Sequence, residues 1–88
     1  MKILRPARKQ LDKLDDKLAR VIYEHIDELK EDPYRPRSRM DIIKIEGDRM
    51  PPVYRLRIGR WRVEYAVLDD NEILIAKVFP RRRDSDYK

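Results

Sequence analysis

The sequence predicts an α+β fold in which two N-terminal helices pack on one face of a small, mainly antiparallel sheet, in the order β-α-α-β-β-β-β. Three observations support this prediction. Apolar residues recur at helical spacings of three and four between Leu11 and Leu29. Two alternating segments, Val53–Ile58 and Trp61–Val67, flank a short turn, as in a β-hairpin. A helical pair on a sheet of four or five strands forms a two-layer α+β architecture.

The first half of the chain supplies one strand and both helices. Residues 1–5 are expected to form a short strand, and Pro6 suits the first turn of a helix over residues 6–14. Asp15 can cap a second helix over residues 15–31, which Asp32-Pro33 ends because the residue before proline leaves the α region. His25 lies within the apolar stripe of this helix, so we expect it to pack at the seam between helix and sheet.

The second half supplies the remaining strands. Residues 34–39 form a basic loop interrupted by Pro36, and residues 40–46 contain the run Ile-Ile-Lys-Ile of a strand. After the hairpin, residues 73–79 are almost continuously apolar, a pattern typical of a strand covered on both faces. Pro80 ends that strand, and a basic tail begins at Arg81.

The hairpin fixes its own register. A two-residue Gly59-Arg60 loop, with glycine first as a type II′ turn prefers, sets three apolar cross-strand pairs that are expected to pack in the core: Ile58 with Trp61, Leu56 with Val63, and Tyr54 with Tyr65. On the other face, Arg57 lies opposite Arg62, and Arg55 lies opposite Glu64. Like charges directly opposite each other destabilise a strand pair. A bound phosphate would relieve this repulsion, whereas the plainer alternative is a solvated face with one structural Arg–Glu ion pair.

Composition limits the classes of function. With 88 residues the chain is expected to be a single domain over residues 1–88, and its net charge of +5 favours nucleic acid or an acidic protein as a partner. No cysteine and only one histidine are present, so a metal site is not expected. With only two glycines the sequence has no Gly-rich phosphate loop, so a nucleotide cofactor is not expected either. No apolar run approaches the ~20 residues of a membrane span, and no signal-peptide pattern opens the chain, so we expect a cytoplasmic protein with no membrane partner.

Clustered guanidinium groups near a phenol suit metal-free cleavage of RNA. The 2′-hydroxyl attacks the adjacent phosphorus, and fixed cations stabilise the charge that develops on the phosphoryl oxygens. A proton must also leave the 2′-hydroxyl, and another proton must reach the leaving oxygen. The candidate acceptors are Tyr87, Glu64 and Glu46, and Tyr87 requires neighbouring cations to lower its pKa from about 10.

These segments resemble the RelE toxins of the RelE/ParE superfamily, small toxins of bacterial and archaeal toxin–antitoxin pairs. The resemblance covers essentially the whole chain in element order. Its specific motifs are Lys-Ile-Glu-Gly at residues 44–47, Tyr-Arg-Leu-Arg-Ile at 54–58, Trp-Arg-Val-Glu-Tyr at 61–65 and the basic tail with a tyrosine at 81–87. The resemblance implies an mRNA endoribonuclease that cleaves in the ribosomal A site, uses no metal and is silenced by a small antitoxin.

The resemblance also assigns catalytic positions. It places the two basic residues of the third strand at Arg55 and Arg57, the arginine of the fourth strand at Arg62, and the tail arginine and tyrosine at Arg81 and Tyr87. Family members often carry a lysine on the third strand, where this chain has arginine at both positions. Since arginine cannot accept a proton in a protein, Tyr87 becomes the preferred acceptor.

The other expected contacts are with RNA and with an antitoxin. Five further arginines form the expected patch for ribosomal RNA and phosphate: Arg35, Arg37, Arg39, Arg82 and Arg83. The resemblance implies a RelB-like antitoxin, a toxin–antitoxin heterotetramer, and the ribosome and mRNA as targets. Two alternatives remain: a ParE-like inhibitor of DNA gyrase without nuclease activity, and a non-catalytic RNA-binding module of the same fold.

Overall fold

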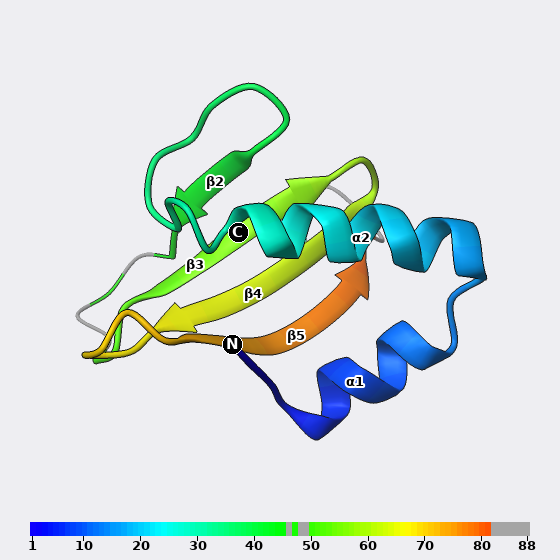
Figure 1. The fold of residues 1–88 in the computed structure, drawn as a ribbon, viewed down its shortest axis with the longest axis horizontal. Coiled ribbons are helices and arrows are strands. Elements are labelled where there is room, and N and C mark those ends of the chain that lie inside the picture. The colour runs from blue at the N-terminus through cyan, green and yellow to red at the C-terminus, as the bar shows by residue number, and fades with distance from the viewer. Residues whose placement is uncertain (46, 48–49, 82–88) are drawn as a thin grey trace.

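The predicted α+β fold is confirmed in the computed structural model, which describes residues 1–45, 47 and 50–81. The elements are β1 (Lys2–Ile3), α1 (Arg5–Asp12), α2 (Asp16–Glu28), β2 (Asp41–Lys44), β3 (Val53–Ile58), β4 (Trp61–Val67) and β5 (Ile73–Pro80). The strands form one sheet in the order β1-β5-β4-β3-β2, in which β1 is parallel to β5 and the other neighbours are antiparallel. Helix α2 crosses one face of this sheet, and α1 lies beside β5 (Figure 1).

Local sequence signals set the helix boundaries. The Asp15 side chain accepts a hydrogen bond of 2.8 Å from the Leu18 backbone N–H, so Asp15 is the N-cap of α2 as predicted. The helix ends at Glu28, earlier than predicted, because the backbone N–H groups of residues 29–31 bond to carbonyls three residues back in a tighter turn. No helix in the described part of the chain is long and apolar enough to cross a membrane.

The face of the sheet under α2 holds the apolar core. Leu56, Val63 and Tyr65 are fully buried there, and Tyr54 and Trp61 pack against the same cluster, so the predicted apolar face of the hairpin is confirmed. The Tyr65 ring stacks on Tyr54 at a centroid distance of 5.7 Å. Its hydroxyl donates a hydrogen bond of 2.6 Å to the Pro33 carbonyl, which joins the core to the loop after α2. Burial of this phenol raises its pKa well above the ordinary value.

The predicted register of the hairpin is also confirmed. Ile58 pairs with Trp61, and the remaining pairs of β3 and β4 follow in step. Gly59 has a φ of 58°, the positive value that the first position of a type II′ turn requires and that glycine adopts without strain.

Two expectations about burial are wrong. Strand β5 is covered on one face only, because Ile73, Ile75 and Val78 are buried while Lys77 is exposed. The pairing of β4 with β5 shifts between Glu64 and Tyr65, which pair with Lys77 and Ile75. Ile75 and Val78 are therefore both buried although they are three residues apart, and this irregular spacing makes the apolar run look continuous. His25 does not pack in the core: it is partly exposed, and its Nδ1–H donates a hydrogen bond of 2.8 Å to the Val21 carbonyl.

Candidate functional site

The face of the sheet opposite α2, called the open face here, carries two rows of side chains aligned across β2, β3, β4 and β5. The first row consists of Asp41, Arg57, Arg62 and Phe79, and the second consists of Ile43, Arg55, Glu64 and Lys77. Along the second row the charges alternate in sign. In the first row, Arg57 and Arg62 are direct cross-strand partners of the same charge. The juxtaposition predicted from the hairpin register is therefore confirmed, and in these rows it is the place where like charges meet.

Carboxylates neutralise two of these arginines. The Arg55 guanidinium donates to Glu64 Oε2 from Nε at 3.2 Å and from Nη2 at 2.8 Å, and both side chains are half-buried. The predicted Arg55–Glu64 pair is thus present. Arg57 forms an ion pair with Asp41, its register partner on β2. The side chain of Arg57 is 58% exposed and that of Asp41 44% exposed, so solvent reaches this pair and it contributes little to stability.

Arg62 is fixed on the open face next to the turn between β3 and β4. Its side chain is buried, with only 3% of the residue exposed, and its Nη1 donates hydrogen bonds of 2.8 Å to the carbonyls of Gly59 and Trp61. Burial lowers the pKa of Arg62, and the positive charges of Arg57, Arg81 and Arg55 lower it further. A guanidinium nevertheless stays protonated at neutral pH. The charged Arg62 side chain therefore lies among other positive charges, and a bound anion would stabilise its protonated form.

Three of the five predicted catalytic residues come together around one hollow. This hollow, of about 210 Å³, is lined by Asp41, Ile43, Arg55, Arg57 and Arg62. Its size suits a phosphate group and not a whole nucleotide. Arg81 lies at the end of β5, where its backbone N–H bonds to the Arg60 carbonyl, and its charge acts on Arg62. Tyr87, Arg82, Arg83 and Glu46 lie outside the described residues.

Asp41 is the residue of this hollow that sequence reasoning missed. The pairing of β2 with β3 aligns Asp41 with Arg57, although the long connection over residues 45–52 separates the two strands in the chain. An Asp at the start of the strand predicted over residues 40–46 is the one signal that the sequence offers. Without the register of β2, that signal does not point to Arg57.

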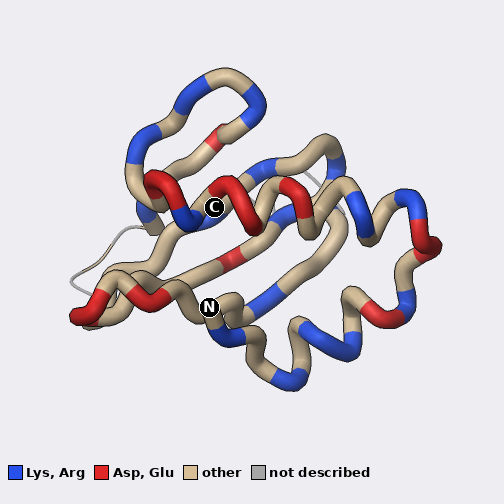
Figure 2. The backbone as a smooth tube through the Cα atoms, in the orientation of Figure 1, with Lys and Arg blue, Asp and Glu red and all other residues tan. Residues whose placement is uncertain are grey.

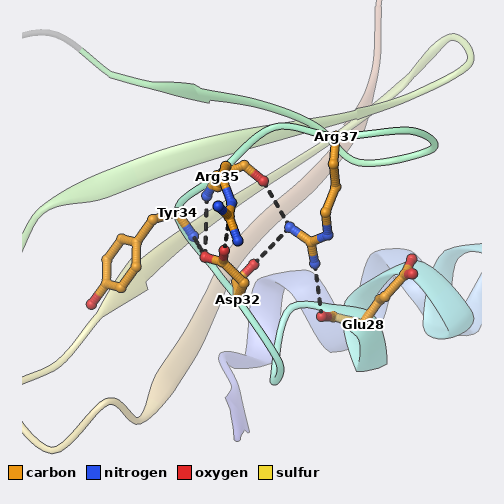
Figure 3. A network of polar contacts seen from close by, with 5 residues as sticks. All are labelled: Glu28, Asp32, Tyr34, Arg35 and Arg37. Atoms are coloured by element: carbon orange, nitrogen blue, oxygen red, sulfur yellow. Dashed lines mark hydrogen bonds and ion pairs between the residues drawn. The ribbon is translucent and has the colours of Figure 1, made fainter.

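The loop arginines serve two different purposes (Figure 3). Arg37 donates to the backbone carbonyls of Glu28, Asp32 and Arg35, so its guanidinium holds the end of α2 and the following loop together. Asp32 accepts backbone hydrogen bonds from Tyr34 and Arg35 and pairs with the Arg35 side chain at 3.3 Å. These two backbone hydrogen bonds lower the pKa of Asp32. Arg35 and Arg39 are exposed, and their contact with RNA stays a prediction.

Charge is also unevenly distributed over the two helices (Figure 2). Basic residues predominate along α1, which carries Arg5, Arg8 and Lys9. Acidic residues gather in the C-terminal half of α2, with Glu24, Asp27 and Glu28. An anionic ligand is therefore favoured near α1 and the open face, and disfavoured near the end of α2.

Comparison with known proteins identifies the family. A family model described as the ParE toxin of the type II toxin–antitoxin system parDE matches residues 1–85. The candidate toxin RelE1 of Methanocaldococcus jannaschii is 44% identical over 66 residues, which span 74% of this chain and 68% of that protein.

Solved structures agree with this match. RelE in the archaeal RelE–RelB complex of Pyrococcus horikoshii is 37% identical, with a TM-score of 0.78 and coverage of 93% of both chains. A chain of the intact RelBE toxin–antitoxin complex of E. coli has a TM-score of 0.61 at 22% identity, covers 93% of this chain and 95% of that one, and so shows the shared fold alone. The chain belongs to the RelE/ParE superfamily of toxins of type II toxin–antitoxin systems, and within it to the RelE family.

Proposed function

We propose that this toxin is a ribosome-dependent mRNA endoribonuclease whose scissile phosphate lies between Arg57 and Arg62. The observation that supports this most strongly is the cross-strand alignment of these two cations beside a hollow of phosphate size. A surface built for stability alone would place opposite charges there, as the row through Arg55 and Glu64 does.

The chemistry needs cations that are already in place. When the 2′-hydroxyl oxygen attacks phosphorus, negative charge builds on the two non-bridging oxygens, and the bond to the 5′-oxygen breaks. Arg62 is held rigid by two carbonyls, so it loses little freedom on binding, while Arg57 adds a second guanidinium from the neighbouring strand. Arg55 and Arg81 supply further positive charge at the edges of the site.

Tyr87 remains the proposed acceptor of the 2′-hydroxyl proton. Glu64, the described member of the three candidates, is already engaged with Arg55 through two hydrogen bonds to its Oε2. Tyr87 and Glu46 lie outside the described residues, so their roles rest on the motif resemblance.

A RelB-like antitoxin is the proposed partner of this toxin. The relative from Pyrococcus horikoshii was solved with RelB, and its similarity extends over nearly all of this chain. An antitoxin that silences the toxin has to cover the open face, and acidic side chains suit its arginines. Two such pairs would form the heterotetramer. The exposed basic residues, Arg35 and Arg39 among them, would dock on ribosomal RNA in the cytoplasm with strongly salt-dependent affinity.

Primer extension on an mRNA in a purified translation system tests the nuclease. Wild-type protein should produce cuts within A-site codons, and Arg57→Ala should reduce their rate by about 10²-fold, as expected for loss of one charge-stabilising group. Arg60→Ala is the matched control, because Arg60 is exposed at the adjacent turn and does not line the hollow. Intact mRNA with wild-type protein, or equal cleavage by Arg57→Ala, would reject the proposal.

Inhibition of DNA gyrase is the second candidate function, because the matching family model is that of ParE. It predicts loss of supercoiling activity when the wild-type protein is added to gyrase, and mRNA that stays intact. The same two assays therefore separate the two functions.

A further inference from the structure

A second hollow lies beside the phosphate site, in the angle between α1 and β5. It has a volume of about 450 Å³ and is lined by Pro6, Gln10, Glu64, Lys77, Val78 and Phe79. It arises because β1 pairs only with the first part of β5, at Leu74 and Ile75, and α1 lies along the strand beyond that point. Gln10 projects from α1 toward this space next to the buried Leu11.

The Arg55–Glu64 ion pair separates the two hollows. Arg55 lines the phosphate hollow, Glu64 lines the second hollow, and the two side chains are joined by bonds of 3.2 and 2.8 Å. The Arg55 guanidinium also lies over the Phe79 ring, 5.8 Å from its centroid. Phe79 is the cross-strand neighbour of Arg62, so an anion midway between Arg57 and Arg62 is roughly 7 Å from the β5 strand, one and a half strand spacings. One nucleotide unit bridges such a distance.

We propose that this second hollow binds a nucleobase of the RNA whose phosphate lies on Arg57 and Arg62. This inference rests on the proposed function. The lining combines an aromatic ring and two aliphatic side chains with an amide, an ammonium and a carboxylate. Unstacked bases of single-stranded RNA are recognised in this way, by stacking on aromatic groups and hydrogen bonding at their edges. Gln10 can both donate and accept, Lys77 donates and Glu64 accepts, so the hollow has partners for both kinds of group on a base.

Binding of an uncleavable RNA to the full chain tests the proposal. Two probes of equal length and equal phosphate number are compared by fluorescence anisotropy: a 2′-O-methyl hexanucleotide, and the same backbone with abasic residues. Wild-type protein should bind the base-containing strand about tenfold more tightly than the abasic strand, the effect of stacking one base. Phe79→Leu and Gln10→Ala should each bring the two affinities closer together, and Gln10→Ala should leave the abasic affinity unchanged.

Controls distinguish this proposal from the one on which it rests. Gln10→Ala changes a half-exposed side chain and should leave the fold intact, so a folding defect in Phe79→Leu does not decide the outcome. Ser38→Ala removes another neutral polar side chain, from the exposed loop, and should keep the wild-type ratio. Equal wild-type affinity for both strands would overturn the nucleobase site and leave the phosphate site standing. Failure to bind either strand would reject the phosphate site and the nucleobase site with it.

Discussion

The two faces of the sheet follow opposite rules, although the same strands build both. On the face under α2, each cross-strand pair of the hairpin is apolar and packed, and the hydroxyl of Tyr65 has its acceptor. On the open face, a carboxylate is available for Arg55 and for Arg57, yet Arg57 and Arg62 still lie opposite each other. Burial of apolar side chains on the first face stabilises the folded chain. On the open face the repulsion between Arg57 and Arg62 remains, and a bound anion can relieve it.

The largest effect expected from this contrast is on stability. Leu56 and Arg57 are neighbours on β3 and point to opposite faces. Leu56→Ala should lower the free energy of unfolding by about 2–5 kcal/mol, because it leaves a cavity in a fully buried site. Arg57→Ala should change it by less than about 0.5 kcal/mol, since it removes both an exposed ion pair and a repulsion. Urea denaturation of both variants makes the comparison, and equal losses would show that the faces do not differ in this way.

The next effect concerns RNA binding. Arg57→Ala should weaken binding of a single-stranded RNA by about tenfold and reduce the slope of log affinity against log salt by about 0.7, the loss of one phosphate contact. Arg60→Ala should leave the slope unchanged. Titrations at several salt concentrations measure both quantities, and an unchanged slope in Arg57→Ala would place the phosphate elsewhere.

A smaller effect is expected at Asp41. Its carboxylate occupies Arg57 in the absence of RNA, so Asp41→Asn should raise RNA affinity by up to about fivefold, the value of an exposed ion pair. Asp69→Asn, in the exposed turn before β5, is the control for the change in net charge. If both variants gain equally, the effect is one of overall charge and Asp41 does not compete for the site.

The smallest effect concerns the loop after α2, where charge serves structure. Backbone hydrogen bonds from Tyr34 and Arg35 lower the pKa of Asp32. The ionised carboxylate therefore contributes to folding stability above the ordinary aspartate pKa of about 3.9, and this contribution is lost as the pH falls through the lower pKa of the folded chain. Amide chemical shifts of Tyr34 and Arg35 should follow this titration. In Asp32→Asn the acid transition should vanish from these two amides, and its persistence would assign it to another group.

Local rules explain what the sequence could predict. A two-residue turn with glycine first determines every pair of the hairpin, and an Asp before an apolar helical stripe marks the N-cap of α2. Both depend on residues close together in the chain. The like-charge pair was therefore predictable from sequence.

Features that depend on distant segments were not predictable in the same way. The pairing of Asp41 with Arg57 requires the register of β2, which a long loop leaves open. The irregular pairing of β5 with β4 made its one-sided burial look two-sided. The ring of His25 bonds to a backbone carbonyl and not to a core side chain, and such a partner leaves no trace in the side-chain pattern. The bonds of Arg37 to three backbone carbonyls are invisible in the sequence for the same reason. The second hollow depends on where α1 lies against β5, a tertiary arrangement that no local motif encodes.

The most direct measurement of a phosphate site on the open face is an NMR titration of the arginine Nε–H signals with an uncleavable 2′-O-methyl RNA. If the phosphate lies between Arg57 and Arg62, their signals shift together, at the same RNA concentration, while the signal of Arg37 stays in place. Shifts confined to the loop arginines, or the absence of a response from Arg57 and Arg62 when RNA is bound, would contradict a phosphate site on the open face.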